Sequence, residues 1–155
     1  VEGGVGGGAR RQDSVMAGLA EIPDADGRVL IHDAARPLLT PSLVQAVIAR
    51  LLVGDTDGVI PAVPIGDTIK RVTGDRVVET VERGDLVAVQ TPQGFDLRTL
   101  RAAHDAAAFD ATDDASMVEA IGGSIAVVDG DPANIKVTFA TDLPVAETLR
   151  SRHDD

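Results

Sequence analysis

The sequence predicts an α/β fold, a single domain built around a mostly parallel sheet. Short apolar runs alternate along the chain with segments of helical period, and this alternation is typical of strands joined by crossover helices. The run at residues 29–31 is wholly apolar and ends just before a carboxylate at Asp33, as expected for a buried strand of a parallel sheet. No apolar run approaches the length of a membrane span. We therefore treat residues 1–155 as one globular unit.

Two helices and two strands are expected in the first half of the chain. A helix should begin near Val15, because Asp13 or Ser14 can cap its free backbone N–H groups. Thr40 is a suitable N-cap followed by proline at the first helical position, and the helical period continues to Gly54. The expected strands of this half are residues 29–31 and 58–63.

The second half of the chain begins with a segment of a different kind. Between residues 65 and 89, short β-prone pieces are separated by Gly74 and Asp75, and few apolar residues are present to form a core. This pattern predicts an extended hairpin arm. After the arm, the alternation returns. The expected helices are residues 96–109, 113–121 and 141–150, and the expected strands are residues 124–128 and 135–138.

The second of these helices should begin with a cap at Thr112 or Asp113, and Asp114 is expected to be an ordinary carboxylate of its first turn. His104 is expected on the surface of the preceding helix.

Asp33 and Arg36 directly follow the first expected strand. Ligands of open α/β sheets bind at the carboxyl ends of the strands, so both side chains should lie at a ligand-binding edge. A carboxylate can hold a metal ion and an arginine fork can hold a phosphate, which suits phosphoryl chemistry. The same spacing is also typical of a strand that ends in an Asx turn with a solvated arginine.

Composition excludes several classes of function. The chain has 14 basic and 25 acidic residues, and its net charge of −11 argues against a nucleic-acid-binding surface. It has neither tryptophan nor tyrosine, so the stacking platforms of single-strand binders are missing. The absence of cysteine excludes disulfides, thiolate metal sites and cysteine nucleophiles, and it is consistent with a cytoplasmic protein.

Five short motifs are the most specific feature of the sequence. They are His-Asp-Ala-Ala-Arg-Pro at 32–37, Asp-Thr-Ile-Lys at 67–70, Thr-Pro-Gln at 91–93, Thr-Asp-Asp-Ala-Ser at 112–116 and Asn-Ile-Lys-Val-Thr at 134–138. In this order they resemble the 2-C-methyl-D-erythritol 4-phosphate cytidylyltransferases, and the resemblance covers nearly the whole chain. It implies a Rossmann-like nucleotidyltransferase sheet with a protruding β-arm, at about residues 65–89, through which two copies form a homodimer.

The resemblance also implies a reaction. Enzymes of this family transfer a cytidylyl group from CTP to 2-C-methyl-D-erythritol 4-phosphate, with Mg²⁺ as cofactor, and release pyrophosphate. The product is 4-diphosphocytidyl-2-C-methyl-D-erythritol, an intermediate of the non-mevalonate route to isoprenoids. Such a transfer brings two anions together, so it depends on cations and on positioning more than on acid–base chemistry.

The motifs assign a role to each matching residue. The implied catalytic residues are Lys136, Arg83 and Asp33, and Asp33 would also face the magnesium ion. The implied residues for methylerythritol phosphate are Arg36, Thr68, Thr91 and Thr112, and those for the cytosine are Gly8, Ala9 and Ser14. Taken singly, such hydroxyls are typical of turns and helix caps, and Lys136 could be a solvated strand lysine. The roles therefore depend on the motifs as a set.

One element of the family pattern is not found in these 155 residues. The family opens with a strand and a glycine-rich loop, roughly Ala-Ala-Gly-x-Gly-x-Arg followed by Pro-Lys, that grips the triphosphate. The chain resembles roughly the last two thirds of the family's domain, so we expect the first one or two strand–helix units to be missing and this chain alone to be inactive. Two alternatives remain open, a ribitol-phosphate cytidylyltransferase and a non-catalytic dimeric binding module.

Overall fold

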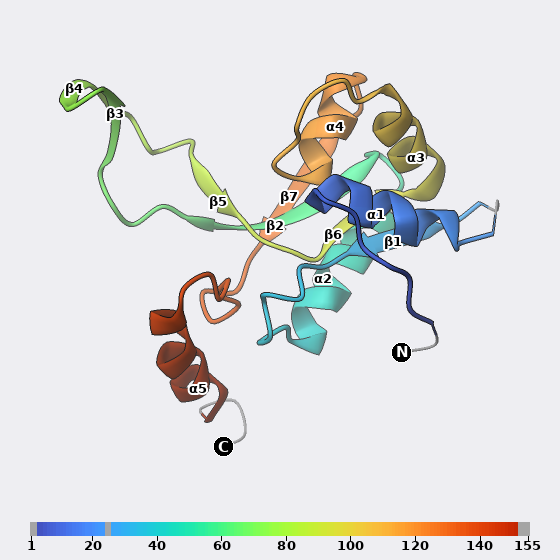
Figure 1. Cartoon of the computed structure of the whole chain (residues 1–155), viewed down its shortest axis with the longest axis horizontal. Coiled ribbons are helices and arrows are strands. Elements are labelled where there is room, and N and C mark those ends of the chain that lie inside the picture. The colour runs from blue at the N-terminus through green and yellow to red at the C-terminus, as the bar shows by residue number, and fades with distance from the viewer. Residues whose placement is uncertain (1–2, 24–25, 152–155) are drawn as a thin grey trace.

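A mixed five-stranded sheet forms the centre of the structure, a computed structural model that describes residues 3–23 and 26–151. The strands of this sheet are β1 (Arg28–Ile31), β2 (Gly58–Pro64), β5 (Val87–Val89), β6 (Gln93–Asp96) and β7 (Ile125–Asp129). Strand β6 lies between β1 and β2, and β2 also pairs with β5 and β7 (Figure 1). The α/β fold expected from the sequence is confirmed.

The strands of the sheet run in two directions. Strands β1, β2 and β7 share one direction, as a parallel sheet requires, and β2 and β7 pair in parallel. Strands β5 and β6 run the other way, so the pairs β1–β6, β2–β6 and β2–β5 are antiparallel. The chain returns from the arm directly through β5 and β6 without a crossover helix, and such a return gives antiparallel pairing.

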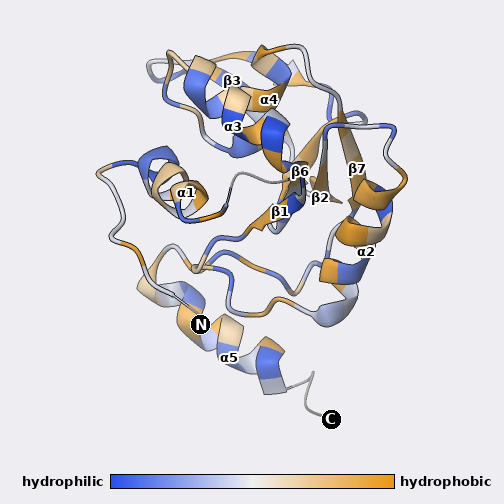
Figure 2. Cartoon of the chain, turned by 90° about the vertical axis from the view of Figure 1, so that its right-hand side faces the viewer, coloured by the Kyte–Doolittle hydropathy of each residue, from blue (hydrophilic) through white to orange (hydrophobic). Residues whose placement is uncertain are grey.

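Helices cover both faces of the sheet. Helices α1 (Arg11–Ala20), α3 (Leu97–Ala106) and α4 (Asp114–Ala120) pack on one face, and α2 (Pro41–Leu52) packs on the other (Figure 2). Each face of the sheet therefore has its own hydrophobic core. Side chains of β1 point alternately to the two faces: Val29 and Ile31 contact the core under α1, α3 and α4, and Leu30 contacts the core under α2.

Most helix starts agree with the capping signals in the sequence. Thr40 caps α2, Asp96 caps α3 and Asp113 caps α4, each with its side-chain oxygen. The predicted start of the first helix at Val15 is wrong, because α1 begins at Arg11. Asp13 lies within the first turn and accepts a hydrogen bond from the Arg10 backbone N–H at 3.1 Å, which stabilises the earlier start.

The expected strand at residues 135–138 is also absent, since this segment is an irregular loop in the structure. Its backbone touches the turn after β1 through one hydrogen bond, from Val137 N–H to the Ala35 carbonyl at 2.8 Å. A single bond does not make a ladder, but it fixes the loop next to the turn.

The predicted hairpin arm is present as a separate two-stranded sheet. Strands β3 (Ile69–Thr73) and β4 (Arg76–Val81) pair only with each other, and Gly74 takes the positive φ of +60° that the connecting turn requires. Figure 1 places this hairpin at the end of two extended segments, far from the central sheet.

The last elements of the described chain are η1 (Ala140–Asp142) and α5 (Leu143–Ser151). Helix α5 lies apart from the sheet in both views and packs against η1 (Figures 1 and 2). Across residues 3–23 and 26–151, every helix falls short of the length and apolarity that crossing a membrane demands.

Candidate functional site

A polar pocket of about 430 Å³ opens at the carboxyl edge of the sheet. Strands β1 and β7 point toward the same edge, so the turn after β1 and the loop after β7 meet there. Five of the residues predicted from the sequence line this pocket: Asp33, Arg36, Thr91, Thr112 and Lys136.

Asp33 lies between two cations in this pocket. Its Oδ2 is 3.0 Å from the Lys136 Nζ, and its Oδ1 accepts a hydrogen bond from the Arg11 Nε at 3.1 Å. Burial alone would raise the pKa of Asp33, but the hydrogen bonds from Lys136 and Arg11 outweigh it, and the pKa is lowered. Asp33 is therefore ionised at neutral pH, and it fixes the position of the Lys136 ammonium group.

Arg36 holds the backbone around the pocket. Its Nη1 donates to the Asn134 carbonyl at 2.7 Å and its Nη2 donates to the Val89 carbonyl at 3.3 Å. Among the described residues, its buried Nε has no hydrogen-bond partner. Burial lowers the pKa of Arg36, although the charge of Asp33 opposes this shift. Arg36 thus ties the loop that carries Lys136 to strand β5.

Thr91 uses its hydroxyl to shape the turn that carries Asp33. The oxygen accepts a hydrogen bond from the Asp33 N–H at 3.0 Å and lies 3.0 Å from the His32 Nδ1. The His32 Nε2 lies 3.0 Å from the Arg36 carbonyl, which can only accept, so this nitrogen carries the proton and Nδ1 accepts from Thr91. In this arrangement Thr91 supports the pocket wall, and its direct contact with a substrate stays a prediction.

The opposite wall is formed by the start of α4. Thr112 lines the pocket beside Asp113, whose carboxylate accepts from the Ser116 N–H at 3.1 Å and from the Gln93 Nε2 at 2.9 Å. Asp113 therefore acts as a helix cap, as the sequence suggested. Nothing in the sequence, apart from its place in the Thr-Pro-Gln motif, indicates that Gln93 donates to Asp113.

The two arm residues lie elsewhere. Arg83 follows β4, and its Nη1 donates to the backbone carbonyls of Ile65 and Gly66, so it closes the base of the arm. Thr68 is exposed and directly precedes β3. Neither residue is part of the pocket lining within the described chain.

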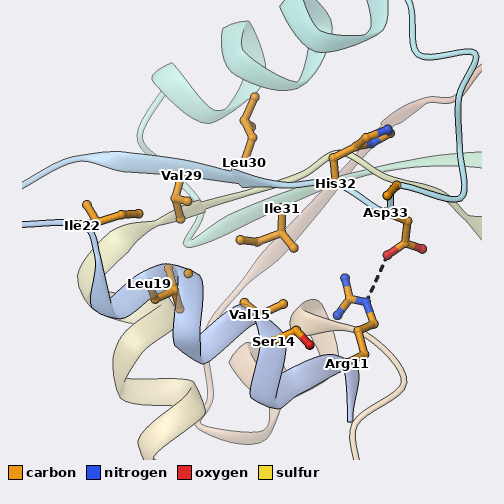
Figure 3. A pocket seen from close by; sticks show the side chains of 12 residues that line it. Arg11, Ser14, Val15, Leu19, Ile22, Val29, Leu30, Ile31, His32 and Asp33 are labelled. Carbon is orange, nitrogen blue, oxygen red and sulfur yellow. Dashed lines mark hydrogen bonds and ion pairs between the residues drawn. The ribbon is translucent and has the colours of Figure 1, made fainter. Parts of the chain in front are cut away.

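A second pocket, of about 470 Å³, adjoins the first on the side of α1 (Figure 3). Val15, Leu19 and Ile31 contribute to its apolar wall, and Ser14 lies toward its polar end. Arg11 and Asp33 line both pockets, so their ion pair forms a common wall between them. Of the three residues predicted for the cytosine, Ser14 alone lines this pocket, whereas Gly8 and Ala9 lie in the preceding loop.

Three residues near the pockets have contacts that the sequence does not predict. The sequence assigns no role to Arg11, and it predicts an ordinary first-turn carboxylate at Asp114 and a helix-surface position for His104. That expectation for His104 is wrong, since its side chain is buried against Asp114, which is itself fully buried. Helical spacing held a signal for Arg11, because it lies one turn before Val15 on the face of α1 that meets the core.

The described residues do not build a magnesium site around Asp33. No group of three or more histidine, aspartate or glutamate side chains is close enough to hold a metal ion in the part of the chain that the structure describes. Both oxygens of Asp33 face cations, and a magnesium ion would have to displace Arg11 or Lys136 from it. The sequence-based assignment of Asp33 to magnesium stays a prediction that this arrangement does not favour.

The fold and the pocket together define an α/β protein with a site suited to phosphate groups at the carboxyl edge of its sheet. The model of one family, described as 2-C-methyl-D-erythritol 4-phosphate cytidylyltransferase, matches residues 4–152, and the chain belongs to this family.

Similar proteins agree with this assignment. A protein of Corynebacterium diphtheriae named 2-C-methyl-D-erythritol 4-phosphate cytidylyltransferase is 50% identical over an alignment of 150 positions, and the match covers 94% of this chain and 61% of that protein. A protein of Solidesulfovibrio magneticus named bifunctional enzyme IspD/IspF is 52% identical, over 88% of this chain and 34% of that protein.

The fold is likewise similar to that of solved structures. The crystal structure of the cytidylyltransferase from Thermus thermophilus has a TM-score of 0.86 and 36% identity, and the match covers 95% of this chain and 72% of that one. Among the relatives compared by sequence, the chain spans 61% of the length of the Corynebacterium protein and 34% of the length of the bifunctional protein.

Proposed function

We propose that the protein carrying this chain transfers a cytidylyl group from CTP to 2-C-methyl-D-erythritol 4-phosphate and releases pyrophosphate. The observation that carries the proposal is the convergence of Lys136 and Asp33, from two motifs far apart in the sequence, in one polar pocket. Family membership supports the identity of the two substrates. The reaction would belong to the non-mevalonate route to isoprenoids, and the absence of cysteine favours a cytoplasmic location.

The geometry suggests how these residues assist the transfer. Lys136 keeps 47% of its side-chain surface exposed, so its ammonium group can reach a bound phosphate while its ion pair with Asp33 limits its movement. A cation held in place before the reaction offsets the repulsion between the polyol phosphate and the nucleotide without costly reorganisation. Arg11 and Arg36 add positive charge to the same pocket, and Arg36 holds the loop that carries Lys136 through its hydrogen bond to the Asn134 carbonyl.

Magnesium is proposed as the cofactor of the transfer. When bound, the ion would neutralise charge on the triphosphate. The ion pairs of Asp33 leave little free carboxylate for a metal and argue against Asp33 as its ligand. If Asp33 is not a ligand, the magnesium concentration that gives half-maximal activity should be the same in wild type and in Asp33→Asn.

The role of Lys136 is tested by Lys136→Ala. Loss of one preorganised cation typically costs about 3 kcal/mol of transition-state stabilisation, so we expect turnover to fall roughly a hundredfold. Release of pyrophosphate by the protein that carries this chain is measured with CTP, magnesium and methylerythritol phosphate, and with ribitol phosphate in parallel as the alternative acceptor. Arg50→Ala removes a cation from a surface ion pair on α2 and serves as the control. Near-normal turnover in Lys136→Ala would contradict the proposal.

The cytosine is proposed to bind near the loop before α1. The hydroxyl of Ser14 accepts a hydrogen bond from the Gly8 N–H at 3.1 Å, which holds the loop against the helix. A side chain on Gly8 would collide with the Cβ of Asp13, so the close approach requires glycine here. Backbone groups of Gly8 and Ala9 could then contact the edge of a pyrimidine.

A homodimer through the arm is also proposed. Val72, Val77 and Val78 are more than half exposed on the β3–β4 hairpin, and such side chains are suited to an interface. In this arrangement Arg83 and Thr68 would reach the site of the partner subunit, which is consistent with their distance in sequence and space from the pocket lining.

A mixing experiment tests the shared site. Arg83→Ala and Lys136→Ala should each have strongly reduced turnover, but mixed dimers would contain one site that lacks neither residue. We expect part of the activity to return on mixing. Recovery of no activity in mixtures that demonstrably contain mixed dimers would contradict the shared site.

A further inference from the structure

A line of ionisable side chains runs from the pocket into the core. Lys136 contacts Asp33, whose other oxygen accepts from the Arg11 Nε at 3.1 Å. The Nη1 of Arg11 donates to the Asp114 Oδ2 at 2.7 Å, and the His104 Nε2 donates to the Asp114 Oδ1 at 2.9 Å. The five residues come from α1, α3, α4, the turn after β1 and the loop after β7, so the line joins five parts of the fold.

The inner end of this line is the carboxylate of Asp114, and its burial costs free energy of folding unless the carboxylate is paired. Asp114 is fully buried, and a buried carboxylate without partners would strongly destabilise the fold. Burial alone would lower the pKa of Arg11, but the charge and hydrogen bonds of Asp114 and Asp33 outweigh this effect and raise it. Arg11 is therefore a permanent cation, and it bridges one buried and one pocket carboxylate.

The bridge that Arg11 makes between Asp114 and Asp33 determines which carboxylate oxygen of Asp33 is available to Lys136. Arg11 is anchored to Asp114 through Nη1, so it approaches Asp33 with Nε alone and contacts only Oδ1. An arginine without that anchor could bind Asp33 with two nitrogens and occupy both of its oxygens. The second oxygen, Oδ2, is the one that holds Lys136.

We propose that the buried Asp114, held by His104, is a positioning residue: it anchors Arg11, limits the contact of Arg11 with Asp33 to one oxygen, and so reserves the other oxygen for Lys136. The inference rests on the proposed function for its catalytic consequence, but the arrangement of charges can be tested without substrate. An ion pair that served stability alone would not govern the state of Lys136.

Chemical labelling of lysine provides a test. The chain contains two lysines, Lys70 on the arm and Lys136 in the pocket, so Lys70 is an internal control in the same sample. Brief acetylation followed by peptide mass spectrometry gives the reaction rate of each lysine. In the nearly isosteric variant Asp114→Asn, Arg11 should turn toward Asp33 and release Lys136. We expect Lys136 to react roughly fivefold faster, the size associated with loss of a partly exposed ion pair, with Lys70 unchanged.

A second variant identifies Arg11 as the cause. In the double variant Arg11→Gln/Asp114→Asn, no arginine competes for Asp33, so the acetylation rate of Lys136 should return to the wild-type value. Circular dichroism confirms that each variant is folded. An unchanged Lys136 rate in Asp114→Asn, or an elevated rate in the double variant, would overturn the proposal.

Kinetics separate this proposal from the proposed function. Asp114→Asn should lower kcat roughly tenfold and leave KM for CTP unchanged, because positioning acts on the transfer rather than on nucleotide binding. If Asp114→Asn does not fold, Arg11→Lys keeps the charge but has only one nitrogen to offer Asp33, so the acetylation rate of Lys136 should stay at the wild-type value, and a faster rate would overturn the proposal. A wild-type protein that transfers no cytidylyl group but gives the expected labelling would disprove the proposed function and leave the positioning role intact.

Discussion

The two ion pairs of Asp33 link the pocket to the pH dependence of stability. The pKa of Asp33 is lower in the folded chain than its ordinary value of about 4, so its ionised form stabilises the fold above that pH. This contribution is lost as the pH falls through the folded pKa. We expect Asp33→Asn to be less stable than wild type by about 1–3 kcal/mol near neutral pH, and the difference to shrink below about pH 4.

Urea unfolding across this pH range measures the effect. Asp55→Asn is a matched control, because Asp55 also pairs with an arginine but is exposed to solvent. Screening by water makes such a surface pair contribute little, so its loss should change the free energy of unfolding much less. Equal effects of the two substitutions would contradict the stabilising role of Asp33.

Single residues of the site were predictable where a motif places them after a strand. Asp33 follows the apolar run of β1, and Lys136 belongs to a distinctive motif, so both could be assigned to the pocket edge. The hydrogen-bond partners of the Thr91 hydroxyl could not be predicted, because they belong to a turn that lies far away in the sequence. Asp114 and His104 were missed for the same reason, since their burial depends on how α3 packs against α4.

At the scale of elements, β6 shows how closely α2 packs on the sheet. A Cβ added to Gly94 would lie 2.9 Å from the Val47 Cγ1 and 3.0 Å from the Leu30 Cδ2, both in a tightly packed core. We expect Gly94→Ala to destabilise the protein by about 1–3 kcal/mol through overpacking. Gly18→Ala is the control, because its Cβ would meet open space within α1, and it should stabilise by about 0.5–1 kcal/mol. Urea denaturation measures the free energy of unfolding of both variants. A Gly94→Ala variant as stable as wild type would contradict the close packing of α2 on β6.

The same packing explains which elements the sequence could predict. Helix α2 and the hairpin arm were evident, because caps, apolar period and a glycine turn are local signals. Strand β6 was not evident, since Gln93 and Gly94 are poor strand formers and tertiary contacts determine their conformation. The loop at 135–138 was mistaken for a strand for the opposite reason, because its local β propensity has no neighbouring strand to pair with.

For the whole molecule, stability should be unevenly distributed. Strand β2 pairs with three other strands and its Val59 is fully buried, whereas the arm hairpin pairs only with itself and exposes its valines. Helix α5 packs mainly against η1 and leaves Leu143 and Val145 half exposed. Local opening costs least where few buried contacts are lost.

Hydrogen exchange should reproduce this distribution. We expect the slowest amide exchange in β2 and β6 and the fastest in α5, because opening the sheet requires loss of both cores. The arm gives the decisive reading. If two copies pair through β3–β4, amides of the hairpin should become protected as the protein concentration rises roughly a hundredfold, since association stabilises the covered segment by mass action. Arm amides that exchange rapidly at every concentration would contradict dimerisation through the arm, whereas a protected arm beside an unprotected α5 would show that the interface is confined to the hairpin.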